Sequence, residues 1–162
     1  MNKSAISLSE NVRTAAIGLL QQCLADAIDL ASQAKQAHWT VKGTNFIALH
    51  ELFDRIATDV AEYGDLMAER ISALGGQAEG TVRAAAESSS LARYPLDISA
   101  SSAHVDALSN ALAAFGASAR RAIDAAAGIG DQGTADVFTE ISRGADKYLW
   151  FVQAHAHDHH RY

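Results

Sequence analysis

Residues 75–100, GGQAEGTVRAAAESSSLARYPLDISA, separate two long helical patterns and decide how the chain folds. The stretch gathers glycines and serines and holds the single proline of the chain, Pro95. A short helix is predicted inside it, from about Val82 to Glu87. A link of two to eight residues merely turns a chain back, whereas about 25 residues can carry it along the length of a helical bundle. The stretch therefore predicts a long crossover connection.

Apolar periodicity predicts four long helices around this connection. They run from an S-x-x-E capping box at Ser7–Glu10 to about Trp39, from Thr44 or Asn45 to Leu74, from about Ser102 to Ala127, and from about Thr134 to His155. Such a chain is all-α, and its long link between the second and third helices is typical of the ferritin-like four-helix bundle. We expect one domain over residues 1–162, with flexible tails at 1–8 and about 156–162.

Bulk properties restrict the function. The chain of 162 residues has a net charge of −6, so its surface as a whole is not a nucleic-acid binder. Cys23 is the only cysteine and falls in an apolar pattern, which predicts a buried thiol and excludes an intrachain disulfide. No run of about 18 apolar residues and no signal-peptide pattern occur, so we expect neither a membrane span nor secretion, and a cytoplasmic location.

The second predicted helix carries metal-binding side chains at helical spacing. His50 and Asp54 lie four residues apart, as do Asp65 and Glu69, so each pair shares a helix face. The steps from Asp54 to Asp65 leave about 20° between them around the axis, so all four residues form one stripe. The two pairs are still about 16 Å apart along the helix, and a metal–ligand bond is about 2 Å. One ion cannot bind both pairs of the same helix.

The stripe is symmetric, which suggests how two copies can complete a site. The midpoints of 50 with 69 and of 54 with 65 both fall at 59.5, and Ala57 and Ala61 between the pairs permit close approach. An antiparallel copy related by a two-fold axis there would place the first pair of one chain against the second pair of the other, twice over. His38, at the end of the first helix, can add a ligand beside His50.

The donor set favours iron. Two histidines with three carboxylates form a mixed nitrogen and oxygen set, less suited to structural zinc. The E-x-x-H motif of di-iron bundles is absent, so a site inside the bundle is not expected. The alternative is that the acidic residues form a solvated helix face. Because the other faces of this helix are apolar, unpaired carboxylates on it would be costly, and an intersubunit site is the prediction.

The motifs around these residues resemble those of the Dps family, the DNA-binding proteins from starved cells. The run from 38 to 69 contains HWxVKGxxFxxLHxxFD and DxxAER, and LGG at 74–76, YPLDI at 94–98 and TADVFTEISRGADKYLWF at 134–151 extend the likeness over nearly the whole chain. The resemblance implies a hollow dodecamer that oxidises Fe(II) at two-fold interfaces, usually with hydrogen peroxide, and stores the ferric mineral. It also implies that His38, His50 and Asp54 come from one subunit, and Asp65 and Glu69 from its neighbour, as catalytic metal ligands.

Many members of that family bind DNA, and the N-terminus argues against the same behaviour here. Members that bind DNA through the N-terminus carry several lysines there, whereas this chain has only Lys3 and Arg13. A second departure concerns iron entry: Asn110 and Ser118 occupy positions aligned with the pore aspartates of many relatives. The resemblance therefore implies acidic funnelling of iron only if Asp106 or Asp124 substitutes. The terminal AHAHDHHRY is either a weak metal-binding tail or an inert end. A DNA-compacting protein and a shell without a working site remain rival functions.

The sequence also predicts the role or environment of two tryptophans and one histidine. Trp39 beside His38 either intercepts stray oxidising equivalents or closes the first helix as an apolar plug. Trp150 fits an apolar stripe on the last helix and is predicted to lie in the core. His104 is predicted to be a solvated residue at a helix start.

Overall fold

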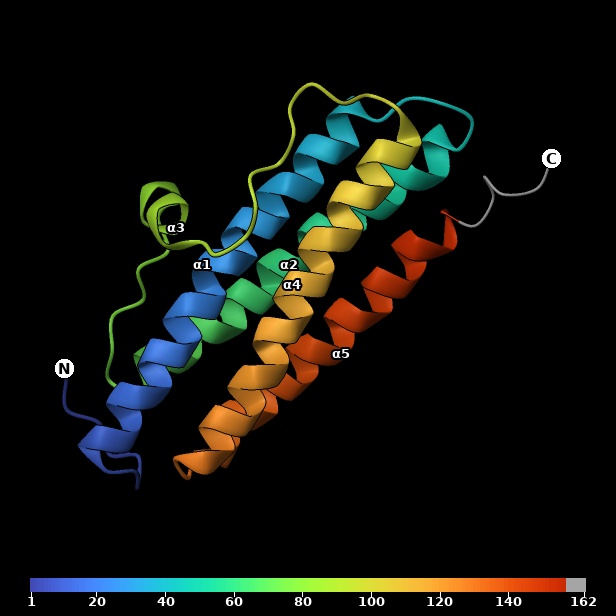
Figure 1. Ribbon diagram of the computed structural model, residues 1–162. Helices are drawn as coiled ribbons and strands as arrows, with labels where there is room; N and C mark the ends of the chain where they lie inside the picture. Colours follow the sequence, from blue (N-terminus) through green and yellow to red (C-terminus); the bar gives the residue numbers. More distant parts are fainter. Residues whose placement is uncertain (157–162) are drawn as a thin grey trace.

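The computed structural model describes residues 1–156, and five helices make up most of it. They are α1 (Glu10–Thr40), α2 (Phe46–Ala73), α3 (Val82–Ser88), α4 (Ser101–Gly128) and α5 (Gln132–Ala154). Figure 1 shows the four long helices as an elongated bundle, with α3 on a connection that runs along its outside. The predicted all-α ferritin-like bundle with a long crossover is confirmed. Among the described residues, no helix is long and apolar enough to span a bilayer.

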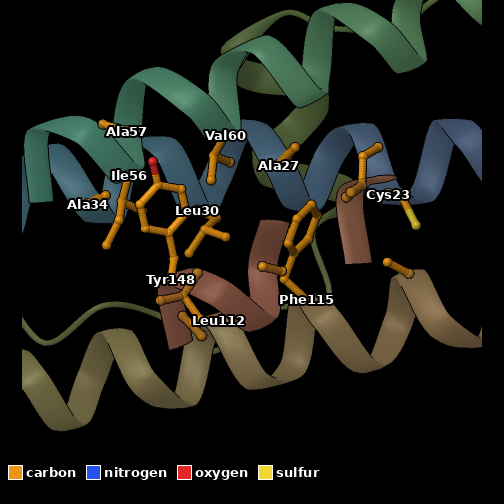
Figure 2. Packing of buried hydrophobic residues seen from close by; sticks show 14 of the residues in the cluster. Cys23, Ala27, Leu30, Ala34, Ile56, Ala57, Val60, Leu112, Phe115 and Tyr148 are labelled. Carbon is orange, nitrogen blue, oxygen red and sulfur yellow. The ribbon is translucent and has the colours of Figure 1, made fainter. Parts of the chain in front are cut away.

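The core lies between two helical hairpins. α1 packs mainly on α2, and α4 mainly on α5. Leu30, Ile56, Phe115 and Tyr148 come from all four long helices and are fully buried where the hairpins meet (Figure 2). Burying such side chains stabilises the fold by about 1.5–3 kcal/mol each. Cys23 is buried as predicted, and burial raises the pKa of its thiol to about 11.

The helix ends show which polar residues start each element. Ser9, rather than Ser7, caps α1, because its hydroxyl accepts a hydrogen bond from the backbone N–H of Val12 at 3.3 Å. The predicted capping box is therefore wrong by two residues. At the turn into α5, Asp131 accepts from the backbone N–H of Thr134 at 3.0 Å and completes an N-cap.

Buried and half-buried polar side chains of α1 hold the crossover against the bundle through hydrogen bonds. Asp26 is fully buried and accepts hydrogen bonds from the backbone N–H of Ser90 at 2.7 Å and from its hydroxyl at 2.9 Å. One turn further along, Asp29 accepts from the Ser89 hydroxyl at 2.6 Å. Gln33 then donates to the carbonyl oxygen of Ala92 at 3.0 Å. These bonds hold the connection along the bundle and satisfy carboxylates that would otherwise be costly to bury.

Two sequence predictions are wrong. Trp150 is 66% exposed, because α5 instead buries Ile141, Tyr148 and Val152, and Trp150 lies about 200° around the helix from Tyr148. His104 is buried rather than solvated. The end of the crossover covers it, and the Tyr94 hydroxyl is hydrogen-bonded to its Nδ1. Burial accordingly lowers the pKa of His104.

The first residues of the chain lie against the end of α2. The backbone N–H of Asn2 donates to the carbonyl oxygen of Gly75 at 2.8 Å, and Arg13 donates to that of Leu74 at 2.9 Å. Gly75 has φ +88°, and a Cβ there would meet the Asn2 carbonyl oxygen at 2.6 Å. The flexibility expected of residues 1–8 stays a prediction. The flexibility expected of the C-terminal tail concerns almost only residues 157–162, and these lie outside the described residues.

Candidate metal centre

His38 and His50 lie face to face where α1 ends and α2 begins. Their ring centroids are 3.7 Å apart, with 20° between the planes. His38 Nδ1 is 2.7 Å from the carbonyl oxygen of His50, and His50 Nδ1 is 2.8 Å from that of His38. A carbonyl oxygen only accepts, so each Nδ1 carries the hydrogen and donates it. The short loop from 41 to 45 does place His38 beside His50.

This reciprocal pairing leaves the other nitrogen of each ring available. When Nδ1 holds the hydrogen, Nε2 of a neutral imidazole has a free lone pair and can bind a metal. A hydrogen bond from the opposite nitrogen to a carbonyl is the usual way in which a protein orients a ligating histidine. Both side chains are half-buried, so their rings are held in place without being closed off.

Asp54 follows His50 by one turn and is engaged by a lysine. Lys35 Nζ of α1 lies 2.6 Å from Asp54 Oδ1. The hydrogen bond from Lys35 is the largest of the effects that hold the pKa of Asp54 below its usual range, with smaller contributions from the charges of Lys35, His38 and His50. The carboxylate is thus ionised, with a competing cation already bound to it. Sequence reasoning missed Lys35, although it precedes His38 by three residues and shares its helix face.

Asp65 and Glu69 are exposed about three and four turns beyond Asp54 along α2. Within residues 1–156 of a single chain, no group of three or more His, Cys, Asp or Glu side chains is placed to hold a metal ion. The structure brings His38 and His50 together, places Asp54 one turn beyond His50, and leaves Asp65 and Glu69 apart from them. The five-residue ligand set stays a prediction.

The surface between the two pairs is shallow and made of small side chains. On α2, Thr58 and Ala61 are exposed, whereas Ala57, predicted with Ala61 to permit close approach, is buried. Across the groove on α1, Ala31 and Ser32 line the same depression, together with Lys35. Helices that expose small residues in this way can be approached closely by another helix.

Trp39 projects away from the bundle next to this site. It is 67% exposed, so its interpretation as an apolar plug that closes the first helix is wrong. The ammonium group of Lys35 lies 5.9 Å from the centroid of its ring. Lys35 therefore contacts both the candidate ligand Asp54 and the exposed indole.

Comparison with known proteins places the whole chain in one family. The ferritin-like domain family matches residues 17–161. A relative from Agrobacterium fabrum (strain C58), named DNA protection during starvation protein, is 43% identical over 157 residues, which are 97% of each chain. A protein of that name from Mycolicibacterium smegmatis is 31% identical over 91% of this chain and 80% of its own.

Solved structures agree with these relatives. The tetragonal form of Mycobacterium smegmatis Dps is 30% identical, covers 95% of this chain and 94% of its own, and has a TM-score of 0.90. Dps from Microbacterium arborescens in the high iron form is 35% identical, with 94% and 97% covered and a TM-score of 0.86. By domain, sequence and structure alike, the chain belongs to the Dps family of ferritin-like proteins.

Proposed function

We propose that this chain sequesters and stores iron, and that it oxidises Fe(II) at sites shared between two copies of the chain. One observation carries the proposal: the two ligand pairs lie at opposite ends of one stripe of α2, with small exposed side chains between them. A relative whose structure is described as a high iron form supports iron as the metal. Relatives named DNA protection during starvation protein support a cytoplasmic protein that protects DNA.

A two-fold axis through the middle of the stripe completes the sites. With a second α2 antiparallel across Thr58 and Ala61, which are exposed, the His50 end of each helix faces the Glu69 end of its partner, and two equivalent sites form. The absence of a three-ligand group within the described part of one chain is consistent with this arrangement. The aromatic and aliphatic side chains exposed on the surface, Trp39, Phe46, Ile47 and Trp150, supply apolar area for further contacts between copies, as a dodecamer requires.

The ligands suit the oxidation of iron by hydrogen peroxide. Fe(II) would bind the Nε2 atoms of His38 and His50 and the carboxylates of Asp65 and Glu69 of the partner chain, and Asp54 would bind after releasing Lys35. Two Fe(II) ions give up one electron each, and one peroxide with two protons becomes two waters, so no hydroxyl radical is released. Carboxylate oxygens bind Fe(III) more strongly than Fe(II), which favours the oxidised product.

Replacement of a single carboxylate tests this proposal. Glu69→Ala should sharply slow peroxide-driven Fe(II) oxidation in stopped-flow absorbance, because it removes one anionic ligand from every site, while native mass shows an intact assembly. Glu140→Ala, which removes an exposed carboxylate from α5, is the matched control and should oxidise iron at the wild-type rate. A wild-type rate in Glu69→Ala would remove this residue from the ligand set.

DNA compaction is the second candidate function, and the name of the relatives, DNA protection during starvation protein, favours it. Protection of DNA requires either contact with it or removal of the iron that damages it. The site on α2 supports the second route. A gel shift with duplex DNA separates the two routes. A shell without a working site, the remaining rival, would bind no stoichiometric Fe(II).

A further inference from the structure

Tyr148 places a phenol in the core beside a carboxylate. Its side chain is 1% exposed, and its hydroxyl donates a hydrogen bond to Asp59 of α2. Figure 2 shows the ring reaching across the core from α5, with its hydroxyl oxygen directed at α2. Asp59 lies on the side of α2 that faces α5, away from the stripe of candidate ligands. The pair therefore belongs to no part of the proposed metal site.

The partner of this hydroxyl is a base rather than a neutral acceptor. Residues 1–156 contain three tyrosines, and Tyr148 is the one that donates to a carboxylate. Burial, and then the hydrogen bond to Asp59, raise the pKa of Tyr148, so the phenol keeps its proton at neutral pH. A core hydroxyl that only needed a partner could use a backbone carbonyl, without the cost of desolvating a carboxylate.

An aromatic row joins this phenol to the surface along α5. The ring of Tyr148 meets Phe151 edge-on, with centroids 6.1 Å apart. Phe151 in turn lies 4.9 Å from the ring of Trp150, which is exposed. On the other side, the ammonium group of Lys147 lies 4.8 Å from the Tyr148 centroid. A ring that lost an electron alone would carry positive charge beside this cation, so oxidation of Tyr148 must also release its proton.

We propose that Tyr148 is a redox-active tyrosine, with Asp59 as its proton acceptor and Trp150 as its contact with oxidants at the surface. A hydroxyl radical takes one electron from the Trp150 indole and becomes hydroxide, which solvent protonates to water. Tyr148 returns the electron to Trp150 and passes its phenolic proton to the Asp59 carboxylate. The products are a neutral tyrosyl radical inside the bundle and a restored indole. The buried radical is kept from cross-linking to other molecules.

The hydroxyl radical would form in solution, where Fe(II) meets peroxide outside the proposed metal site, so the inference does not rest on the proposed function and the first experiment contains no iron. The assembled protein is illuminated with ruthenium tris-bipyridine and persulfate, which generate a one-electron oxidant, and is then freeze-trapped for electron paramagnetic resonance. Wild type should give a tyrosyl signal. Tyr148→Phe should lose it, while Tyr63→Phe, which removes a half-buried phenol on α2, should keep it. Circular dichroism and native mass confirm that each variant is folded.

Two more variants test the partners of Tyr148. Asp59→Asn keeps an acceptor for the hydrogen bond but removes the base, so the tyrosyl signal should fall and an indolyl signal should persist. Trp150→Phe should lower the tyrosyl yield. The proposal is overturned if Tyr148→Phe keeps the wild-type signal, or if Tyr94→Phe is the variant that loses it. A wild-type yield in Asp59→Asn would refute the proton transfer, and one in Trp150→Phe would refute the surface contact.

Repeating the measurement with Fe(II) and hydrogen peroxide separates this inference from the proposed function. A Tyr148 radical under illumination, combined with no iron oxidation at all, would retain the redox tyrosine and reject the ferroxidase site. Rapid iron oxidation with no Tyr148 radical in either experiment would retain the ferroxidase site and reject the redox tyrosine.

Discussion

The imidazoles of His38 and His50 are prepared for a metal, whereas the carboxylate of Asp54 is occupied. Each ring donates its Nδ1 hydrogen to the carbonyl of the other residue, which fixes the tautomer before any ion arrives. Asp54 is bound to Lys35. An aspartate needs no lysine to be ionised at neutral pH, because its ordinary pKa is about 3.9. The main effect of Lys35 on the site is therefore competition with the incoming cation.

Removal of this competing cation should strengthen iron binding. In Lys35→Gln, we expect anaerobic titration calorimetry to show Fe(II) bound several-fold more tightly, because Asp54 becomes free and a positive charge leaves the site. Lys42→Gln, which removes an exposed lysine beyond the end of α1, should leave the affinity unchanged. Unchanged or weaker binding in Lys35→Gln would show that the lysine assists the site instead.

At the scale of single elements, short polar networks decide how the helices join. Arg70, which follows the candidate ligand Glu69, donates to Asp131 at 2.9 Å and to the Thr134 hydroxyl at 3.1 Å. Burial alone would raise the pKa of Asp131, but the bonds from Thr134 and the charge of Arg70 outweigh it and hold this pKa below its usual value. The network ties the end of α2 to the start of α5.

Asp131→Ala should be strongly destabilising at neutral pH. It removes the α5 cap and leaves a half-buried guanidinium without its partner, a loss of about 3 kcal/mol or more. Because the folded pKa of Asp131 lies below its unfolded value, its stabilisation is complete above about pH 3.9 and declines as the pH falls below that. Urea denaturation should therefore show a gap between wild type and Asp131→Ala that narrows in acid.

Asp136→Ala, an exposed aspartate one turn into α5, is the control for this experiment and should stay within about 0.5 kcal/mol of wild type at both pH values. A gap for Asp131→Ala that stayed constant into acid would mean that the cap, rather than the ionised pair, supplies the stability.

The spacing of neighbouring residues predicted some features of the helices correctly, but it could not predict features that depend on packing between segments. The stripe on α2 and the breaker before α5 could be predicted, because helical periodicity and glycine turns are properties of neighbouring residues. The hydrogen bonds between α1 and the crossover could have been predicted, because polar residues repeat at helical spacing along α1. These residues are Gln22, Asp26, Asp29 and Gln33. No sequence signal predicts the burial of His104, because that burial depends on a segment outside its own helix folding over it. Trp150 was misplaced because several apolar stripes fit α5 equally well.

At the scale of the whole molecule, charge argues against strong DNA binding. The chain carries a net charge of −6. Of its two N-terminal cations, Arg13 is buried and donates to the carbonyl of Leu74, which leaves Lys3 as the exposed one. Phosphate contacts by free cations supply most non-specific affinity for DNA. The histidines of the C-terminal tail lie mostly outside the described residues and can add charge only in mild acid.

We therefore expect no gel shift of duplex DNA at pH 8 and physiological salt, and a weak one near pH 6, where the tail histidines become protonated. Deletion of residues 155–162 should abolish the shift at the lower pH. Tight binding at pH 8 that survives this deletion would make DNA compaction the leading function.

The central claim is that two chains share each metal site, and co-assembly of two inactive variants tests it most directly. One variant carries His50→Ala and Asp54→Ala, and the other carries Asp65→Ala and Glu69→Ala. Neither has a complete site alone. At an interface between the two kinds of chain, one site collects all four replacements and the other collects none. With random mixing about half of the interfaces are mixed, so about a quarter of all sites should work again.

Stopped-flow absorbance on the co-assembled particle, with mixing verified by native mass, is the deciding measurement. The shared site predicts that peroxide-driven Fe(II) oxidation returns to about a quarter of the wild-type rate. If mixing is verified and the rate stays at the level of the separate variants, each site lies within one chain, and the symmetry of the α2 stripe has no role in iron binding.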